Sequence, residues 1–192
     1  NPLVAGKGIR YLRERGITVE THVLKEECDR LNPVFFHYIR KKTPYVVMKY
    51  AMTMDGKIAA YTGASKWVTG EQARAYVQQE RHRYRGIMVG VGTVLADDPM
   101  LSCRMPGGRN PVRIICDTHL RTPLSSQVVK TAKEISTILA VCETDKSRYR
   151  PYQEAGCQIL TLPDADGHLD LNALMEKLGE ERIDSVLLEG GG

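Results

Sequence analysis

The sequence predicts an α/β protein whose largely parallel sheet is covered by helices on both faces. Short apolar runs alternate with helix-like segments from residue 45 to residue 188, the order typical of parallel strands joined by crossover helices. Residues 49–99 read as strand, polar turn, helix, strand and glycine turn, as in open sheets that bind phosphorylated ligands. The chain has 192 residues, 42% of them hydrophobic and 26% charged, so one globular domain with a small appendage is expected.

The beginning of the chain is expected to form short separate elements. Residues 8–15 have a helical pattern with Gly16 as a C-cap, and TVETHVL at 18–24 alternates like a strand. A second helix is expected over residues 26–32, after which Pro33 either kinks it or opens another turn. The basic, proline-flanked segment RKKTP then predicts a linker into the rest of the chain.

The strands and helices of the main sheet are expected from residue 45 onward. Thr69-x-x-Gln72 matches a capping box, which predicts a helix from there to about Tyr84. Later helices are expected over 146–155 and 170–178, between the last apolar runs. Strands are expected over residues 45–51, 86–91, 112–116, 136–141, 158–162 and 185–188.

Composition and spacing exclude several classes of protein. The five cysteines are odd in number and scattered, which argues for reduced thiols in a cytoplasmic protein and against a disulfide framework or a zinc site. The five histidines share no metal-ligand spacing, so no metal is expected. No apolar run approaches the roughly 18 residues that a membrane-spanning helix needs.

Charge favours a small anionic ligand. The formal net charge is +4, and arginines gather on the helix predicted before Tyr84 and in the segment after it. A nucleic-acid-binding surface would interleave such charges with more aromatic residues, so we expect no nucleic-acid partner. The arginines of this set are Arg74, Arg81, Arg83, Arg85, Arg104, Arg109 and Arg113. Most of them are expected to be solvated.

Four motifs occur in the order KYAMTMDGKIA, GASKW, GVGTVLADDP and LLEGGG. Together they resemble the reductase domain of riboflavin biosynthesis, an NADPH-dependent domain usually fused behind a zinc deaminase. The resemblance runs from Asn1 to Gly192 and implies a dihydrofolate-reductase-like fold. It also implies that the chain is truncated at both ends, because in the family further helix and sheet-closing strands follow the last motif.

The resemblance implies two parts and one reaction. Residues 1–43 would be the tail of a cytidine-deaminase-like domain plus a linker, and 44–192 a reductase domain that is incomplete at its C-terminus. The His-x-Glu and Pro-Cys-x-x-Cys that hold deaminase zinc do not occur here, so zinc is expected only in the absent deaminase domain. The implied reaction is NADPH-dependent reduction of 5-amino-6-(5-phosphoribosylamino)uracil to its phosphoribityl counterpart, by a cytoplasmic homo-oligomer.

Two alternatives to this reductase remain open. A related pterin or folate reductase would not need a clamp for a sugar phosphate. A non-catalytic nucleotide-binding or interface module would bind NADPH without consuming it.

Three side chains are candidates for the chemistry. Lys49 sits at the exit of the first strand expected in the main sheet, where its ammonium would hydrogen-bond sugar hydroxyls or stabilise developing charge. Asp55 would orient a lysine, although Asp-Gly is also ordinary turn chemistry. Glu189 would bind sugar hydroxyls or help to open the imine. The proton donor stays undecided among these three groups and water.

The substrate site rests more strongly on the resemblance. Guanidinium forks suit a bidentate phosphate clamp, and the resemblance selects Arg81 and Arg104 for it, with Leu101 contributing a contact between them. It also assigns Ser65 to the substrate, alongside Glu189.

The expected cofactor is NADPH. A small residue at position 51 would let a nicotinamide or ribose pack against the backbone, and the only tryptophan offers a broad apolar plane. The threonine and aspartate of GVGTVLADDP would hydrogen-bond the cofactor, and the glycines after Glu189 expose N–H groups that suit a pyrophosphate. The residues assigned to NADPH are Ala51, Trp67, Thr93, Asp97, Thr118, Gly191 and Gly192.

Overall fold

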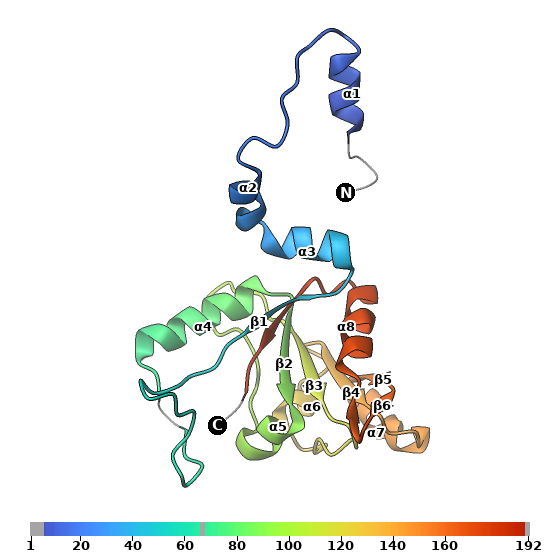
Figure 1. Ribbon diagram of the computed structural model, residues 1–192. Coiled ribbons are helices and arrows are strands. Elements are labelled where there is room, and N and C mark those ends of the chain that lie inside the picture. The colour runs from blue at the N-terminus through green and yellow to red at the C-terminus, as the bar shows by residue number, and fades with distance from the viewer. Residues whose placement is uncertain (1–5, 66–67, 191–192) are drawn as a thin grey trace.

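The computed structural model describes residues 6–65 and 68–190, and its centre is a six-stranded sheet (Figure 1). The strands lie in the order β1-β8-β2-β3-β4-β5, and every neighbouring pair is parallel. Their bounds are β1 Tyr45–Met48, β2 Gly86–Gly90, β3 Val112–Cys116, β4 Thr137–Val141, β5 Gln158–Thr161 and β8 Ser185–Leu188. The last strand therefore lies between the first two, which brings distant segments of the chain together.

The helices lie on both sides of this sheet and at its N-terminal end. Their bounds are α1 Lys7–Arg13, α2 Lys25–Leu31, α3 Pro33–Lys41, α4 Glu71–Arg83, α5 Val91–Asp97, α6 Gln127–Lys130, η1 Lys146–Tyr149 (a 3₁₀ helix), α7 Arg150–Glu154 and α8 Leu171–Glu180. A two-stranded antiparallel hairpin, β6 Asp164–Ala165 with β7 His168–Leu169, precedes α8.

Apolar side chains alternate between two cores, one on each face of the sheet. Ile87 and Val89 of β2 pack with α5, α6 and α7 on one face, whereas Met88 packs against α8 on the other. Leu174 and Leu178 of α8 are fully buried in that second core. The prediction of helices on both faces is therefore confirmed.

Arg113 is an unexpected part of the interior. The side chain is fully buried on β3 rather than solvated, and burial lowers its pKa to about 10. It donates to Thr137 Oγ1 (2.9 Å) and Thr131 Oγ1 (2.8 Å), and to the carbonyls of Val128 (3.0 Å) and Ile135 (2.8 Å). These bonds tie β3 to α6 and to the segment that enters β4.

The N-terminal elements differ most from the prediction. The strand expected over 18–24 is wrong, because His22 and Leu24 have positive φ angles (67° and 50°) and the segment forms coil and turns without a partner strand. Pro33 opens a new helix, α3, at its first turn, and this helix runs through Lys41 into the expected linker. Neither α1 nor α2 contains a buried residue.

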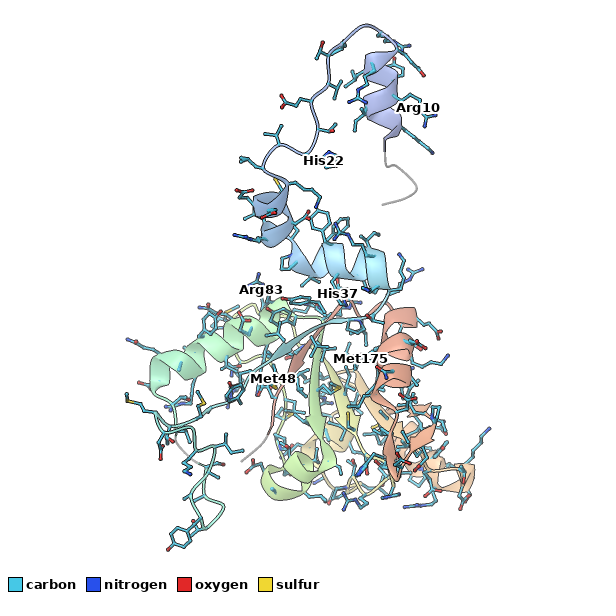
Figure 2. The ribbon with its side chains drawn as sticks, viewed as in Figure 1. Arg10, His22, His37, Met48, Arg83 and Met175 are labelled. Carbon is cyan, nitrogen blue, oxygen red and sulfur yellow. The ribbon has the colours of Figure 1, made fainter. Side chains whose placement is uncertain are left out.

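Helix α3 docks this N-terminal part onto the sheet domain. Tyr38 Oη donates to the carbonyl of Gly179 on α8 (2.9 Å). A Cβ added to Gly179 would lie 1.8 Å from the carbonyl oxygen of Lys42, so only glycine allows this approach. Figure 2 shows Arg10 and His22 far from the sheet, and His37 where α3 meets it.

Several helix and strand boundaries in the sheet domain also differ from the predicted ones. Helix α4 starts at Glu71 with Gly70 as its N-cap and no side-chain cap, so the capping box at Thr69 does not form. The glycine turn expected after β2 is the helix α5, because Val91 and Val94 are buried under the sheet. Strand β1 ends at Met48 rather than at residue 51. The short helix α6 and the β6–β7 hairpin were not predicted.

None of the helices among the described residues is long and apolar enough to span a bilayer.

Candidate active site

The carboxyl ends of β1, β8 and β2 form the base of the site. The backbone N–H of Lys49 donates to the carbonyl of Leu188, and that of Glu189 donates to the carbonyl of Met88, each at 2.9 Å. Sheet-type hydrogen bonds thus continue one residue beyond each strand. Because they fix both backbones, Lys49 and Glu189 leave neighbouring strands at the same edge, where ligands of open parallel sheets bind.

A cavity of about 240 Å³ opens at this edge. Its walls come from the segment after β1, from α4, from α5 with the loop behind it, and from the end of β8. The predicted site residues that line it are Lys49, Ala51, Ser65, Arg81, Thr93, Asp97, Leu101 and Glu189. The structure therefore brings together predicted residues that are up to 140 positions apart in the chain, from Lys49 to Glu189.

Arg81 and Glu189 form a two-bond ion pair in the cavity wall. Nε of Arg81 donates to Oε1 of Glu189 (2.9 Å) and Nη2 donates to Oε2 (2.8 Å). The two side chains are only 14% and 10% exposed. Nη1 of Arg81 also donates to the carbonyl of Ser102 (3.0 Å). In this state the arginine holds a carboxylate of the protein in the manner in which it would hold a phosphate.

The loop after α5 is held from two sides. Arg81 binds the carbonyl of Ser102, and Nη1 of Arg113 donates to the carbonyl of Met100 (3.2 Å). Leu101 lies between these two carbonyls, 3% exposed and with a positive φ of 50°. Two arginines on different elements thus fix an unfavourable backbone conformation at the cavity wall.

Thr93 on α5 lies close to Gly190, which follows Glu189 after β8. Gly190 has φ +124°, and a Cβ added there would lie 3.0 Å from Oγ1 of Thr93. The first turn of α5 therefore lies close to the backbone that follows β8, and this approach depends on glycine at position 190. A threonine hydroxyl and a glycine backbone at this place suit a polar ligand that lies against the main chain.

Three predicted residues are placed elsewhere. Asp55 lies in a turn, where Thr53 Oγ1 donates to its carboxylate, and it lines a neighbouring cavity of about 450 Å³ that shares Ser65 with the first. Arg104 is exposed outside both cavities, and its backbone N–H donates to Oε1 of Gln78 (2.9 Å). Thr118 follows β3 and does not line the cavity, although its carbonyl accepts from Cys142 N–H (2.9 Å).

The remaining predicted residues, Trp67, Gly191 and Gly192, lie outside the described residues. The described part of the chain also contains no group of three or more His, Cys, Asp or Glu side chains placed to hold a metal ion.

Some lining residues were missed by the sequence analysis. Tyr50, Ile58, Val89 and Pro99 line the cavity, and the carbonyl of Ser102 supports it. Three of these side chains are apolar, and Ser102 acts through its backbone, so no polar pattern marks them. Tyr50, Ile58 and Pro99 do fall inside the motifs KYAMTMDGKIA and GVGTVLADDP, which is the signal that was available.

Residues 44–192 match the family model of the RibD C-terminal domain. The whole chain is 57% identical to the riboflavin biosynthesis protein RibD of Actinobacillus pleuropneumoniae and 41% identical to that of Bacillus amyloliquefaciens. It covers 51% of each of these proteins, so the chain spans about half the length of the curated relatives it matches.

Solved structures show the same arrangement. The diaminohydroxyphosphoribosylaminopyrimidine deaminase/5-amino-6-(5-phosphoribosylamino)uracil reductase of Thermotoga maritima superposes with a TM-score of 0.81 at 38% identity, over 100% of this chain and 51% of that one. The riboflavin biosynthesis reductase Rib7 of Saccharomyces cerevisiae gives a TM-score of 0.60 at 25% identity, over 84% of this chain and 72% of that one. The predicted dihydrofolate-reductase-like fold is confirmed. The chain belongs to the RibD C-terminal domain family.

Proposed function

We propose that this chain is the reductase part of a riboflavin-pathway enzyme, which reduces 5-amino-6-(5-phosphoribosylamino)uracil to 5-amino-6-(5-phosphoribitylamino)uracil with NADPH. The observation that carries this proposal is the cavity at the sheet edge, where Lys49, Ser65, Arg81, Thr93 and Glu189 converge from separate elements. Its membership of the RibD C-terminal domain family supports the same reaction.

The reaction needs proton transfers that the protein must manage. Breaking the bond between C1 and the ring oxygen of the ribosylamine gives an imine and a hydroxyl. A hydride then adds to C1 and a proton to the nitrogen, so the balance is substrate plus NADPH plus H⁺ giving product plus NADP⁺. Glu189 lines the same cavity as Lys49 and Ser65, and we assign the proton transfer to its carboxyl group.

Lys49 acts as a cation fixed at the cavity base. Its backbone is held by the Leu188 carbonyl, so its position is set by the sheet rather than by a flexible loop. An ammonium there hydrogen-bonds the sugar hydroxyls and stabilises negative charge that develops on the ring oxygen as the sugar opens. Ser65 lines the same cavity and offers a hydroxyl to the base or the sugar.

The residues at Thr93 fit a dinucleotide. A side chain at position 190 would place its Cβ 3.0 Å from Thr93 Oγ1. Because Gly190 has none, the space between the Thr93 hydroxyl and the backbone stays open to a ligand. The Thr93 hydroxyl, the Asp97 carboxylate and the Gly190 backbone are the donor and acceptor types that ribose hydroxyls and phosphates require. NADPH, when bound, supplies the hydride. We extend its site to Ala51, Trp67, Thr118, Gly191 and Gly192, as expected from the sequence.

Further parts of the proposal concern the whole protein. Five cysteines without a disulfide among the described residues fit a cytoplasmic enzyme. The length that the relatives have beyond this chain leaves room for the zinc deaminase domain, with residues 1–43 as its tail. A homo-oligomer is proposed on the resemblance.

The test is consumption of NADPH by the intact protein, followed by the loss of its near-ultraviolet absorbance. We expect oxidation with the phosphoribosylaminouracil, and a large loss of rate when the phosphate is removed. Binding of NADPH without oxidation would support the nucleotide-binding module instead. Turnover of a pterin or dihydrofolate, but not of the ribosylaminouracil, would support the pterin or folate reductase.

A further inference from the structure

Among the residues that the structure describes, those lining the cavity carry no excess of positive charge with which to bind a phosphate. The charged side chains among these described residues are two cations, Lys49 and Arg81, and two anions, Asp97 and Glu189. A phosphate monoester carries about 1.5 to 2 negative charges near neutral pH. The donors that suit it best, Nε and Nη2 of Arg81, are already bound to Glu189. A phosphorylated substrate therefore competes with Glu189 for Arg81.

The geometry indicates which partner moves. Arg81 is anchored through Nη1 to the Ser102 carbonyl (3.0 Å), in a loop that Arg113 holds as well. The backbone of Glu189 is fixed by the Met88 carbonyl (2.9 Å), but its side-chain carboxylate is held, among the described residues, by Arg81. Rotation of the Glu189 side chain is enough to leave the guanidinium, and it requires no change in the sheet.

We propose that the 5-phosphate of the substrate displaces Glu189 from Arg81, so that phosphate binding releases the carboxylate for proton transfer. This inference rests on the proposed function and adds to it a coupling between two parts of the substrate. Without phosphate, Glu189 is bound as a structural anion on Arg81. With phosphate, Arg81 changes partner, and the Glu189 carboxylate becomes available to the sugar within the same cavity.

The coupling makes the phosphate a determinant of turnover as well as of affinity. A dephosphorylated substrate should lose kcat in addition to having a higher KM, because Glu189 stays on Arg81 in its complex. Inorganic phosphate supplied separately should restore part of that kcat. A clamp that only holds the substrate would raise KM and would not respond to separate phosphate.

The experiment measures kcat and KM of the intact protein with the phosphorylated and the dephosphorylated ribosylaminouracil. Inorganic phosphate is added to the second reaction, and chloride at equal ionic strength is the control. We expect phosphate to raise kcat on the dephosphorylated substrate about tenfold, the factor that one charge-assisted hydrogen bond is worth. On the phosphorylated substrate, phosphate should only compete.

Variants at Arg81 test whether the phosphate effect on kcat acts through this arginine. In Arg81→Met, phosphate stimulation should disappear, and kcat on the dephosphorylated substrate should rise above that of the unstimulated parent protein, because Glu189 has lost the partner that holds it. Arg81→Lys retains a donor for Ser102 and serves if the methionine variant does not fold. Arg83→Met is the matched control, because Arg83 lies on the same helix with its side chain 60% exposed.

Two results overturn the exchange while leaving the reductase in place. One is normal turnover of the phosphorylated substrate without any stimulation of the dephosphorylated one by phosphate. The other is an equal loss of kcat on both substrates in folded Arg81 variants. If the parent protein does not oxidise NADPH with the phosphorylated substrate, the proposed function itself fails, and the exchange fails with it.

Discussion

The interior around Arg113 and the cavity around Arg81 each enclose a guanidinium, but they neutralise it differently. Arg113 is fully buried and is satisfied by carbonyl and hydroxyl oxygens of β4, α6 and the adjoining loops. Arg81 is 14% exposed and is satisfied mainly by the carboxylate of Glu189. One region uses fixed neutral dipoles, and the other uses an ionic partner on a side chain that can rotate.

This difference in partners suggests that Arg113 contributes to stability, whereas Arg81 contributes to ligand binding. The acceptors of Arg113 are backbone carbonyls and the hydroxyls of the buried Thr137 and the half-buried Thr131, all of them fixed parts of the fold rather than of a ligand site. The acceptor of Arg81 lines an open cavity and can be exchanged for a ligand of the same charge. Substitutions in the interior should therefore change unfolding, whereas substitutions in the cavity should change kinetics.

Replacing Arg113 should give the largest effect. We expect Arg113→Met to lower the free energy of unfolding by about 3–5 kcal/mol, because it leaves several buried acceptors without their donor. Urea denaturation followed by circular dichroism measures this loss. Arg85→Met, at an exposed arginine just before β2, should change stability by less than about 0.5 kcal/mol. A loss below about 1 kcal/mol for Arg113→Met would mean that the interior network contributes little.

Replacing Lys49 tests the cavity side of the comparison. Lys49→Met should lower kcat about 100-fold, the effect of removing one donor to developing charge. The free energy of unfolding should change by less than about 1 kcal/mol, because the side chain is partly exposed. Steady-state NADPH oxidation and urea denaturation of the same sample measure both. Lys49→Arg should recover part of the rate, and a stability loss that accounts for the lost rate would contradict the assignment.

The sheet was predictable from apolar runs, and its strand order was not. The strands at 112–116 and 185–188 were predicted to the residue, because buried parallel strands are short, apolar and bounded by turns. Nothing in the local pattern says that β8 inserts between β1 and β2. That insertion is what places Glu189 beside Lys49.

The errors have local physical causes. Residues 18–24 alternate like a strand, but alternation stabilises a strand only when a partner offers hydrogen bonds. Gly90 and Gly92 argue against a helix, yet α5 forms there because burial of Val91 and Val94 outweighs low helix propensity.

The part of the candidate site that lies within the sequence motifs was predictable. Most residues selected through the resemblance do line one cavity, and sequence reasoning named both Arg81 and Glu189. It gave them separate tasks, because a pair 108 positions apart leaves no local signal. Asp55 and Arg104 show the reverse case, since an aspartate in an Asp-Gly turn and a surface arginine look the same with or without a ligand.

A pH dependence of stability should come from a buried thiol in the interior. Burial raises the pKa of the Cys157 thiol from 9.0 to about 11. The neutral thiol therefore favours the folded state below pH 9, and this stability is lost as pH rises to 11, about 2–3 kcal/mol in all. Unfolding free energies of Cys157→Ala should fall less steeply over this range than those of the parent protein. Cys28→Ala, at an exposed thiol, should keep the parent slope, and identical slopes in all three proteins would exclude the effect.

The smallest expected effect comes from Gly190→Ala, which tests whether NADPH binds between Gly190 and Thr93. Gly190→Ala and Gly167→Ala both place a side chain at positive φ (+124° and +81°), so each should cost about 1 kcal/mol of stability. The added Cβ meets Thr93 Oγ1 at 3.0 Å in the first case and nothing within 4 Å in the second. Only Gly190→Ala should weaken NADPH binding, by about threefold to tenfold for a partly displaced hydrogen bond. Calorimetric titration measures it, and equal affinities in the two variants would place the cofactor away from Thr93.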